Sequence, residues 1–131
     1  MAPDAWTPRI AAALLRRGAM VHWMSLVLTL GGIAAVVFGW HGMWPVVIVG
    51  LVEFWLAARV AIDADLFAAL GEDADLARFD EAMHRLGLLP EGKGGRPMDA
   101  RIHGALRLLK LQAAMLLLQI VATFIGMMLL R

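Results

Sequence analysis

Three long runs of apolar residues constrain the fold of this chain more than any other feature. Residues 19–38, 44–62 and 111–130 each come close to the roughly 20 residues that a helix needs to cross a bilayer core. The first and third runs contain no Asp, Glu, Lys or Arg. Hydrophobic residues make up 61% of the chain, against roughly 45–50% in a soluble domain. The pattern predicts an all-α, polytopic membrane protein with three transmembrane helices.

The basic residues predict the direction of these spans. Eleven of the twelve Lys and Arg residues lie before the first span, at the inner end of the second span (Arg59) or between the second and third spans, and the turn 39–43 has none. By the positive-inside rule the N-terminus is cytoplasmic and the C-terminus is outside. We therefore expect a multi-pass protein of a bacterial-type inner (plasma) membrane, with residues 1–131 forming a single membrane domain.

A cytoplasmic helical insertion is predicted at residues 63–110, between the second and third spans. The helical spacing of apolar residues continues beyond the second span to Gly71, which can end the helix. Asp73 can cap a second, amphipathic helix, and Asp99 can cap a long helix that enters the third span. The second and third spans are thus both predicted to protrude on the inner side.

The segment before the first span has two interpretations. Trp6, Ile10 and Leu14 share one helical face, which indicates a short helix lying at the inner membrane surface. A frayed tail is equally consistent with these residues.

Glu53 is the most informative candidate for a functional residue, because it lies near the centre of the second span. An acid at membrane depth costs several kcal/mol or more unless it is protonated, paired or facing a cavity. It therefore marks a functional site by default.

Polar residues on the other two spans form stripes that can shelter this acid. On span one the stripe also contains Gly18, His22 and Gly32. The middle of each span brings Thr29, Glu53 and Gln119 to one depth near the bilayer midplane. The predicted buried polar cluster consists of Glu53, Thr29, Gln119, Ser25, Thr123 and Gln112.

Two further sets of residues are candidates for helix association. Gly31, Ala35 and Gly39 have the small-xxx-small spacing that lets helix backbones approach closely. Acidic residues at the end of span two and basic residues at the start of span three are predicted to lie at the same depth, where they can form an ion-pair collar at the cytoplasmic side. The alternative is that each charged side chain is solvated individually among the lipid headgroups. The collar residues are Asp63, Asp65, Arg107 and Lys110.

Several chemistries find no support in the sequence. The chain has no cysteine, no nucleotide-binding motif and no basic surface separate from its acids, so thiol chemistry and nucleic-acid binding are not expected. The four histidines lie at depths that do not suit a haem. We assign no catalytic residue, metal site or cofactor.

Three functions stay open. The leading interpretation is a non-catalytic subunit, oligomeric or accessory to a larger membrane complex, in which protonated Glu53 bonds to Gln119 or Thr29 and holds the helices in register. The alternative is a homo-oligomeric proton or cation pathway in which Glu53 changes charge while facing an oligomer axis or subunit seam. The third is a metal-dependent lipid-headgroup enzyme at the cytoplasmic face, in which carboxylate oxygens hold a divalent ion. The candidate carboxylates are those of Asp63, Asp65, Glu72, Asp73 and Asp75.

Overall fold

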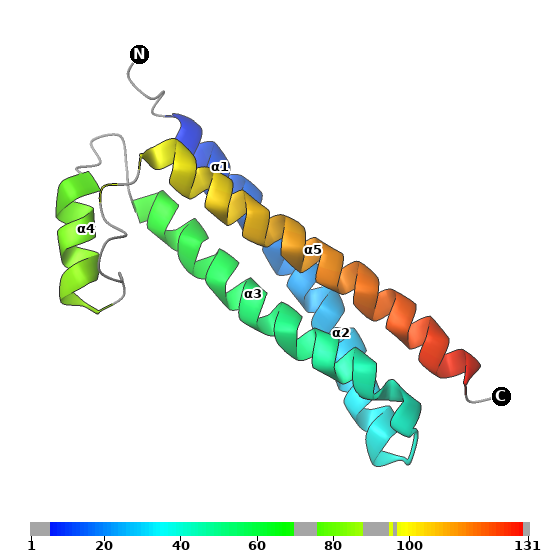
Figure 1. Cartoon of the computed structure of the whole chain (residues 1–131). Helices are drawn as coiled ribbons and strands as arrows, with labels where there is room; N and C mark the ends of the chain where they lie inside the picture. Colours follow the sequence, from blue (N-terminus) through cyan, green and yellow to red (C-terminus); the bar gives the residue numbers. More distant parts are fainter. Residues whose placement is uncertain (1–5, 70–75, 88–94, 96, 130–131) are drawn as a thin grey trace.

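The protein is a bundle of three long helices. The computed structural model describes the backbone of residues 6–69, 76–87, 95 and 97–129 (Figure 1). Within these ranges the elements are helices, and no strand is present. Helices α2 (Gly18–Val37), α3 (Trp44–Ala69) and α5 (Met98–Met128) each contact the other two and alternate in direction. The predicted all-α fold is confirmed.

Three helices are long and apolar enough to cross a membrane, as predicted. The candidate spanning segments are Pro8–Val37, His41–Ala68 and Met98–Met128. All three are longer than the apolar runs read from the sequence. The predicted continuation of the second and third helices beyond these runs is confirmed, because α3 continues to Ala69 and α5 begins at Met98. Most described residues of the predicted insertion therefore extend these two helices, and only α4 (Leu76–Arg85) stands apart.

The N-terminal segment forms helix α1 (Trp6–Arg16), so a frayed tail is the wrong description of these residues. The helix packs against α3 and α5. Its buried residues are Ala11, Ala12 and Leu15, whereas Ile10 and Leu14 are exposed. These buried residues meet Val60, Ala64, Phe67, Met98, Ile102 and Ala105 in one apolar core. This core closes the end of the bundle that carries α1 and the start of α5, here called the basic end.

A tight turn joins α2 to α3 at the opposite end of the bundle. Gly39 has φ of +91°, and its N–H donates to Val36 O at 2.9 Å. The Trp40 N–H donates to Ala35 O at 2.9 Å, so the last carbonyls of α2 are satisfied as in a Schellman motif. A short 3₁₀ helix, η1 (His41–Met43), then leads into α3. Gly39 therefore ends α2 and does not extend the packing stripe predicted from Gly31.

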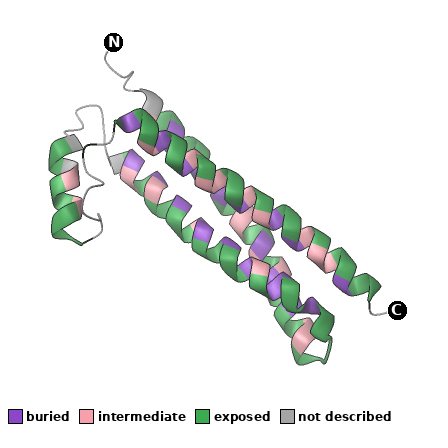
Figure 2. Cartoon of the chain, viewed as in Figure 1, coloured by how far each residue is buried: buried purple, intermediate pink, exposed green. Residues whose placement is uncertain are grey.

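The buried positions of the long helices face one another (Figure 2). Many of the exposed residues are large and apolar. On α3 the buried positions include Val46, Glu53, Val60 and Phe67, which recur every seven residues. This spacing keeps one face of a helix turned toward its neighbours over several turns. Exposed apolar side chains are expected where the solvent around a helix is lipid.

Asp80 ties α4 to α5. Its carboxylate accepts hydrogen bonds from Arg101 Nη2 at 2.7 and 2.8 Å and from the Gly95 N–H at 2.8 Å. The hydrogen bond from the Gly95 N–H lowers the pKa of Asp80, and the Arg101 guanidinium adds to this against the opposing effect of desolvation. The ionised form of Asp80 thus holds the contact.

We expect Asp80→Asn to release α4 from α5 at neutral pH. The pKa of Asp80 is lower in the folded protein than in the unfolded chain. The contribution of Asp80 is therefore complete above its ordinary pKa and is lost as the pH falls through the lowered value. Hydrogen–deuterium exchange of the α4 amides should become about tenfold faster, because hydrogen bonds to charged groups are among the stronger ones. Wild-type protein should show the same change on acidification.

Glu81→Gln is the matched control for this prediction. Glu81 accepts a hydrogen bond from Arg85 one turn along the same helix, and both side chains are exposed. Exposed pairs of this kind contribute little. Exchange in α4 that rises equally in both variants would show that Asp80 is not what holds the helix.

Candidate functional site

Glu53 lies inside the bundle and is sheltered within a single chain. Its side chain is 1% exposed. Gln112 Nε2 on α5 donates to Glu53 Oε1 at 2.8 Å, and His22 Nδ1 on α2 lies 3.1 Å from Glu53 Oε2. Both carboxyl oxygens therefore have partners, one from each neighbouring helix. Within the protomer the acid points into the bundle, whereas the pathway hypothesis had placed it on an outer face, against an oligomer axis or a subunit seam.

The carboxyl group and the imidazole are placed to share one hydrogen. A Glu53 carboxylate can accept it from His22 Nδ1–H, or a protonated Glu53 can donate it to a bare Nδ1. In the first arrangement Nε2 of a neutral His22 has a free lone pair. In the second arrangement Nδ1 is the bare nitrogen, and Nε2 carries the hydrogen of the ring. Proton binding and imidazole tautomer are thus linked at this contact.

Gln112 connects this pair to the backbone of α2. Its Nε2 also donates to Gly18 O at 3.0 Å, so both amide hydrogens are used. A Cβ atom at position 18 would lie 2.8 Å from Gln112 Oε1, which explains why a glycine stands there. Oε1 itself is buried and has no hydrogen-bond partner among the described residues. Close approach of α2 and α5 at this level depends on Gly18.

A second polar layer lies further from the basic end and centres on Gln119. The Ser25 hydroxyl donates to Gln119 Oε1 at 2.6 Å. Gln119 Nε2 has three acceptors within reach: Thr29 Oγ1 at 2.8 Å, Ser25 O at 3.2 Å and Val46 O at 3.3 Å. Because these acceptors lie on α2 and α3, one amide on α5 joins all three helices.

Gly50 gives this layer its space. A Cβ atom built on Gly50 would overlap with Thr29 Oγ1 and would lie 2.8 Å from Gln119 Nε2. Sequence analysis missed this residue, because a glycine in an apolar run carries no polar signal. It occupies the level at which Glu53 had been expected.

The expected partners of Glu53 were wrong. Glu53 bonds to neither Gln119 nor Thr29, and it lies about one helical turn nearer the basic end than they do. His22 was recognised as part of the polar stripe but not as a partner of the acid. The seven-residue spacing of Gln112 and Gln119 could have indicated two layers instead of one.

Thr123 stands apart from both layers of the predicted cluster. Its hydroxyl donates to Gln119 O, a backbone carbonyl of its own helix, at 2.8 Å. It therefore joins no two helices. The structure brings together the other five predicted residues in two separate groups.

Among the described residues, the predicted ion-pair collar is not assembled, and one residue of the predicted packing stripe faces open space. A Cβ on Gly31 would meet nothing within 4 Å, so this face of α2 is open. Asp63 is half-buried, while Asp65, Arg107 and Lys110 are exposed, and no ion pair joins any of these four. The offset between α3 and α5 removes the depth match on which the collar was predicted.

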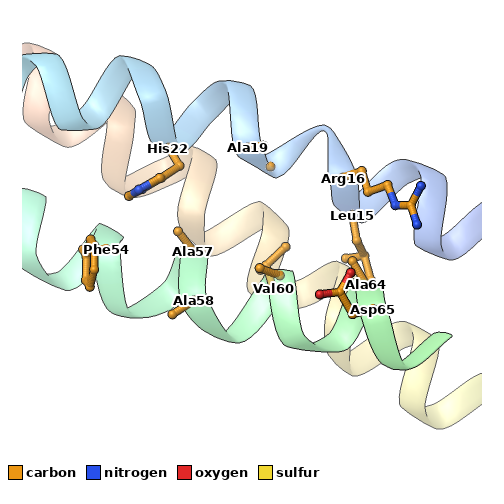
Figure 3. A pocket seen from close by; sticks show the side chains of 12 residues that line it. Leu15, Arg16, Ala19, His22, Phe54, Ala57, Ala58, Val60, Ala64 and Asp65 are labelled. Carbon is orange, nitrogen blue, oxygen red and sulfur yellow. The ribbon is translucent and has the colours of Figure 1, made fainter. Parts of the chain in front are cut away.

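A groove lies between α3 on one side and α1 and α2 on the other, and runs from the basic end to His22 (Figure 3). It is here called the α2–α3 groove. Its volume is about 450 Å³. His22 and Phe54 lie at the end farther from the basic end, here called the deep end, where their rings are tilted with centroids 5.5 Å apart. Arg16 and Asp65 lie at the opposite end, here called the mouth. The His22 side chain is 25% exposed, so the imidazole is the part of the pair that is open to its surroundings.

The described residues contain no group of three or more His, Asp or Glu that could hold a metal ion. Glu72, Asp73 and Asp75, which the enzyme hypothesis also used, lie outside the described residues.

Comparison with known proteins adds no further constraint. No family model, curated protein or solved structure matches this chain.

Proposed function

We propose that this chain is a small membrane subunit that binds a proton at the buried Glu53–His22 pair and changes its helix packing in response. One observation carries the proposal: His22 Nδ1 lies 3.1 Å from Glu53 Oε2, and the same imidazole lines a groove that leads to the basic end. The acid is enclosed, and the histidine connects it to the outside.

The proton transfer uses both imidazole nitrogens. In the starting state Glu53 is a carboxylate and neutral His22 carries its hydrogen on Nδ1. A proton arriving through the groove binds Nε2, and the Nδ1 hydrogen moves to Glu53 Oε2. The products are a neutral glutamic acid and a neutral imidazole with its hydrogen on Nε2. One proton has been bound, and the charge of the pair has changed from −1 to zero.

This change of charge alters the free energy of packing α2 against α3. An uncompensated buried charge is costly in a medium of low dielectric constant. The proton-bound state therefore favours close packing of α2 against α3. The deprotonated state favours separation of these helices and entry of water beside His22. A subunit built this way senses proton activity on the side that its groove faces.

The proposal is limited to proton uptake from the groove. Within the part of the chain that the structure describes, no hydrogen bond links Glu53, His22 or Gln112 to the layer around Gln119. The distribution of Lys and Arg supports placing the basic end in the cytoplasm of a bacterial-type cell. The open face around Gly31 offers a surface for contact with a second copy or a larger membrane complex.

Infrared spectroscopy of the protein in bilayers tests the proposal. We expect acidification to produce the C=O band of a protonated carboxyl that is absent from Glu53→Gln. After a rapid change of pH, His22→Leu should slow the appearance of this band on the order of 100-fold, because a positioned side chain no longer transfers the proton.

His41→Leu is the matched control for the loss of an imidazole. His41 is exposed in the turn at the other end of the bundle, so its variant should respond as fast as the wild type. The proposal fails if no band depends on Glu53, or if the His22 variant responds at the wild-type rate.

A further inference from the structure

We propose that the α2–α3 groove binds one acyl chain of a membrane phospholipid whose headgroup bears a phosphate and a primary ammonium. The phosphate lies at Arg16 and the ammonium at Asp65. This inference deepens the proposed function, because His22 lies at the deep end of the same groove.

The walls of the groove suit hydrocarbon. Between its two ends only Gly, Ala, Val and Leu side chains line it. Its volume of about 450 Å³ lies within the range of roughly 300–1,000 Å³ usual for small-molecule sites. An apolar cavity offers water too few polar partners to hold it in order. An acyl chain can fill this apolar stretch without displacing ordered water.

The length of the groove matches one leaflet of a bilayer. Its lining residues on α3 run from Phe54 to Asp65, which is about 17 Å at roughly 1.5 Å per residue. Half of a hydrocarbon core of about 30 Å is about 15 Å. With its mouth at the headgroup level, the groove ends near the bilayer midplane. A lipid of the adjacent leaflet can enter with its headgroup already at the mouth.

The charges at the mouth select the headgroup. Arg16 and Asp65 are both exposed and form no ion pair with each other. A guanidinium binds a phosphate, and a carboxylate accepts hydrogen bonds from a primary ammonium. An anionic lipid without an amine matches only Arg16, and a quaternary amine has no N–H for Asp65. A primary-amine phospholipid matches both residues.

An acyl chain in the groove covers the exposed side of His22. Water then has no access to the imidazole nitrogen that receives the proton, and the Glu53–His22 pair exchanges slowly. Departure of the lipid opens the pair. Lipid occupancy therefore regulates proton uptake at the proposed site.

Native mass spectrometry of protein released from bilayers tests the inference. The bilayers contain equal amounts of phosphatidylethanolamine and phosphatidylglycerol. We expect one retained phosphatidylethanolamine per chain.

Ala61→Phe fills the groove and should reduce retention about tenfold. Ala58→Phe, also on the α3 side of the groove, should do the same, and Ala114→Phe, exposed on α5 outside the groove, should retain lipid as the wild type does.

The headgroup is tested separately from the acyl chain. Asp65→Asn should retain lipid but lose the preference for phosphatidylethanolamine, and Arg16→Gln should retain less of both lipids. Equal retention by the Ala61 and Ala114 variants overturns the inference. The inference is also overturned if the wild type retains both lipids without preferring phosphatidylethanolamine, or if it retains only a fatty acid or detergent. A dimer that dissociates in the Ala61→Phe variant would overturn it as well, because the groove would then be an interface between two copies.

The two proposals can fail independently. Glu53→Gln should retain lipid as the wild type does, because Glu53 does not line the groove. If lipid is retained as expected but no infrared band depends on Glu53, only the proton proposal fails. If the band appears equally fast with and without phosphatidylethanolamine in the bilayer, lipid regulation fails and proton uptake stands.

Discussion

Gly50→Leu is expected to prevent the three long helices from packing together. Even a Cβ atom at this position would overlap with Thr29 Oγ1 and crowd Gln119 Nε2, and the remaining atoms of leucine have no space between α2 and α5. Overpacking alone typically costs about 1–3 kcal/mol. Displacement of Gln119 also breaks buried hydrogen bonds, so we expect the free energy of unfolding in mixed micelles to fall by about 3 kcal/mol or more.

Gly31→Leu is the matched control, because it makes the same substitution in a neighbouring span. A Cβ at Gly31 would meet nothing within 4 Å, so its side chain extends away from the bundle. The unfolding free energy of the protomer should stay within about 0.5 kcal/mol of the wild type. Similar losses in the two variants would mean that α2, α3 and α5 are not packed as described.

Gln119→Leu is expected to lower the unfolding free energy by about 2–3 kcal/mol. This amide accepts one hydrogen bond and donates two, shared among three acceptors, and each contributes roughly 0.6 kcal/mol on average inside a membrane protein. The leucine also leaves the Ser25 hydroxyl without its acceptor in a buried position. Unfolding in mixed micelles measures the effect, and the helices themselves should remain formed.

Thr123→Val separates this effect from the general loss of a polar group on α5. Thr123 bonds only to the Gln119 carbonyl of its own helix, so its variant should lose less than about 0.5 kcal/mol. A loss in Thr123→Val equal to that in Gln119→Leu would contradict a role for Gln119 in joining the three helices.

The elements of the fold are readable from the sequence because they depend on local patterns. Charge-free apolar runs indicate the spans, and the spacing of apolar residues beyond the second span correctly predicts the extension of α3. The start of α5 was predicted to within two residues, but its cap was wrong: the N-cap residue is Pro97, with no side-chain cap hydrogen bond, and Asp99 lies in the first turn. These features need no knowledge of which helix lies beside which.

The level at which the helices meet could not be read in the same way. Placing the centres of the apolar runs at one depth put Glu53 beside Thr29 and Gln119, but side-chain fit offsets the helices by about one turn. Gly50 and Gly18 permit close approach at two levels, and each level then gathers its own polar side chains. The partners of a buried acid follow from packing across helices, which apolar run boundaries do not specify.

Helix α5 is synthesised last, and it supplies the hydrogen-bond partners of polar groups on α2 and α3. The hairpin of α2 and α3 is complete while Gln112 and Gln119 are still being synthesised. During that interval Glu53 Oε1 lacks its amide donor, and the Ser25 hydroxyl lacks its acceptor. Biogenesis therefore cannot finish at the hairpin stage, and a chain truncated before α5 presents the polar groups by which quality control can recognise it as incomplete.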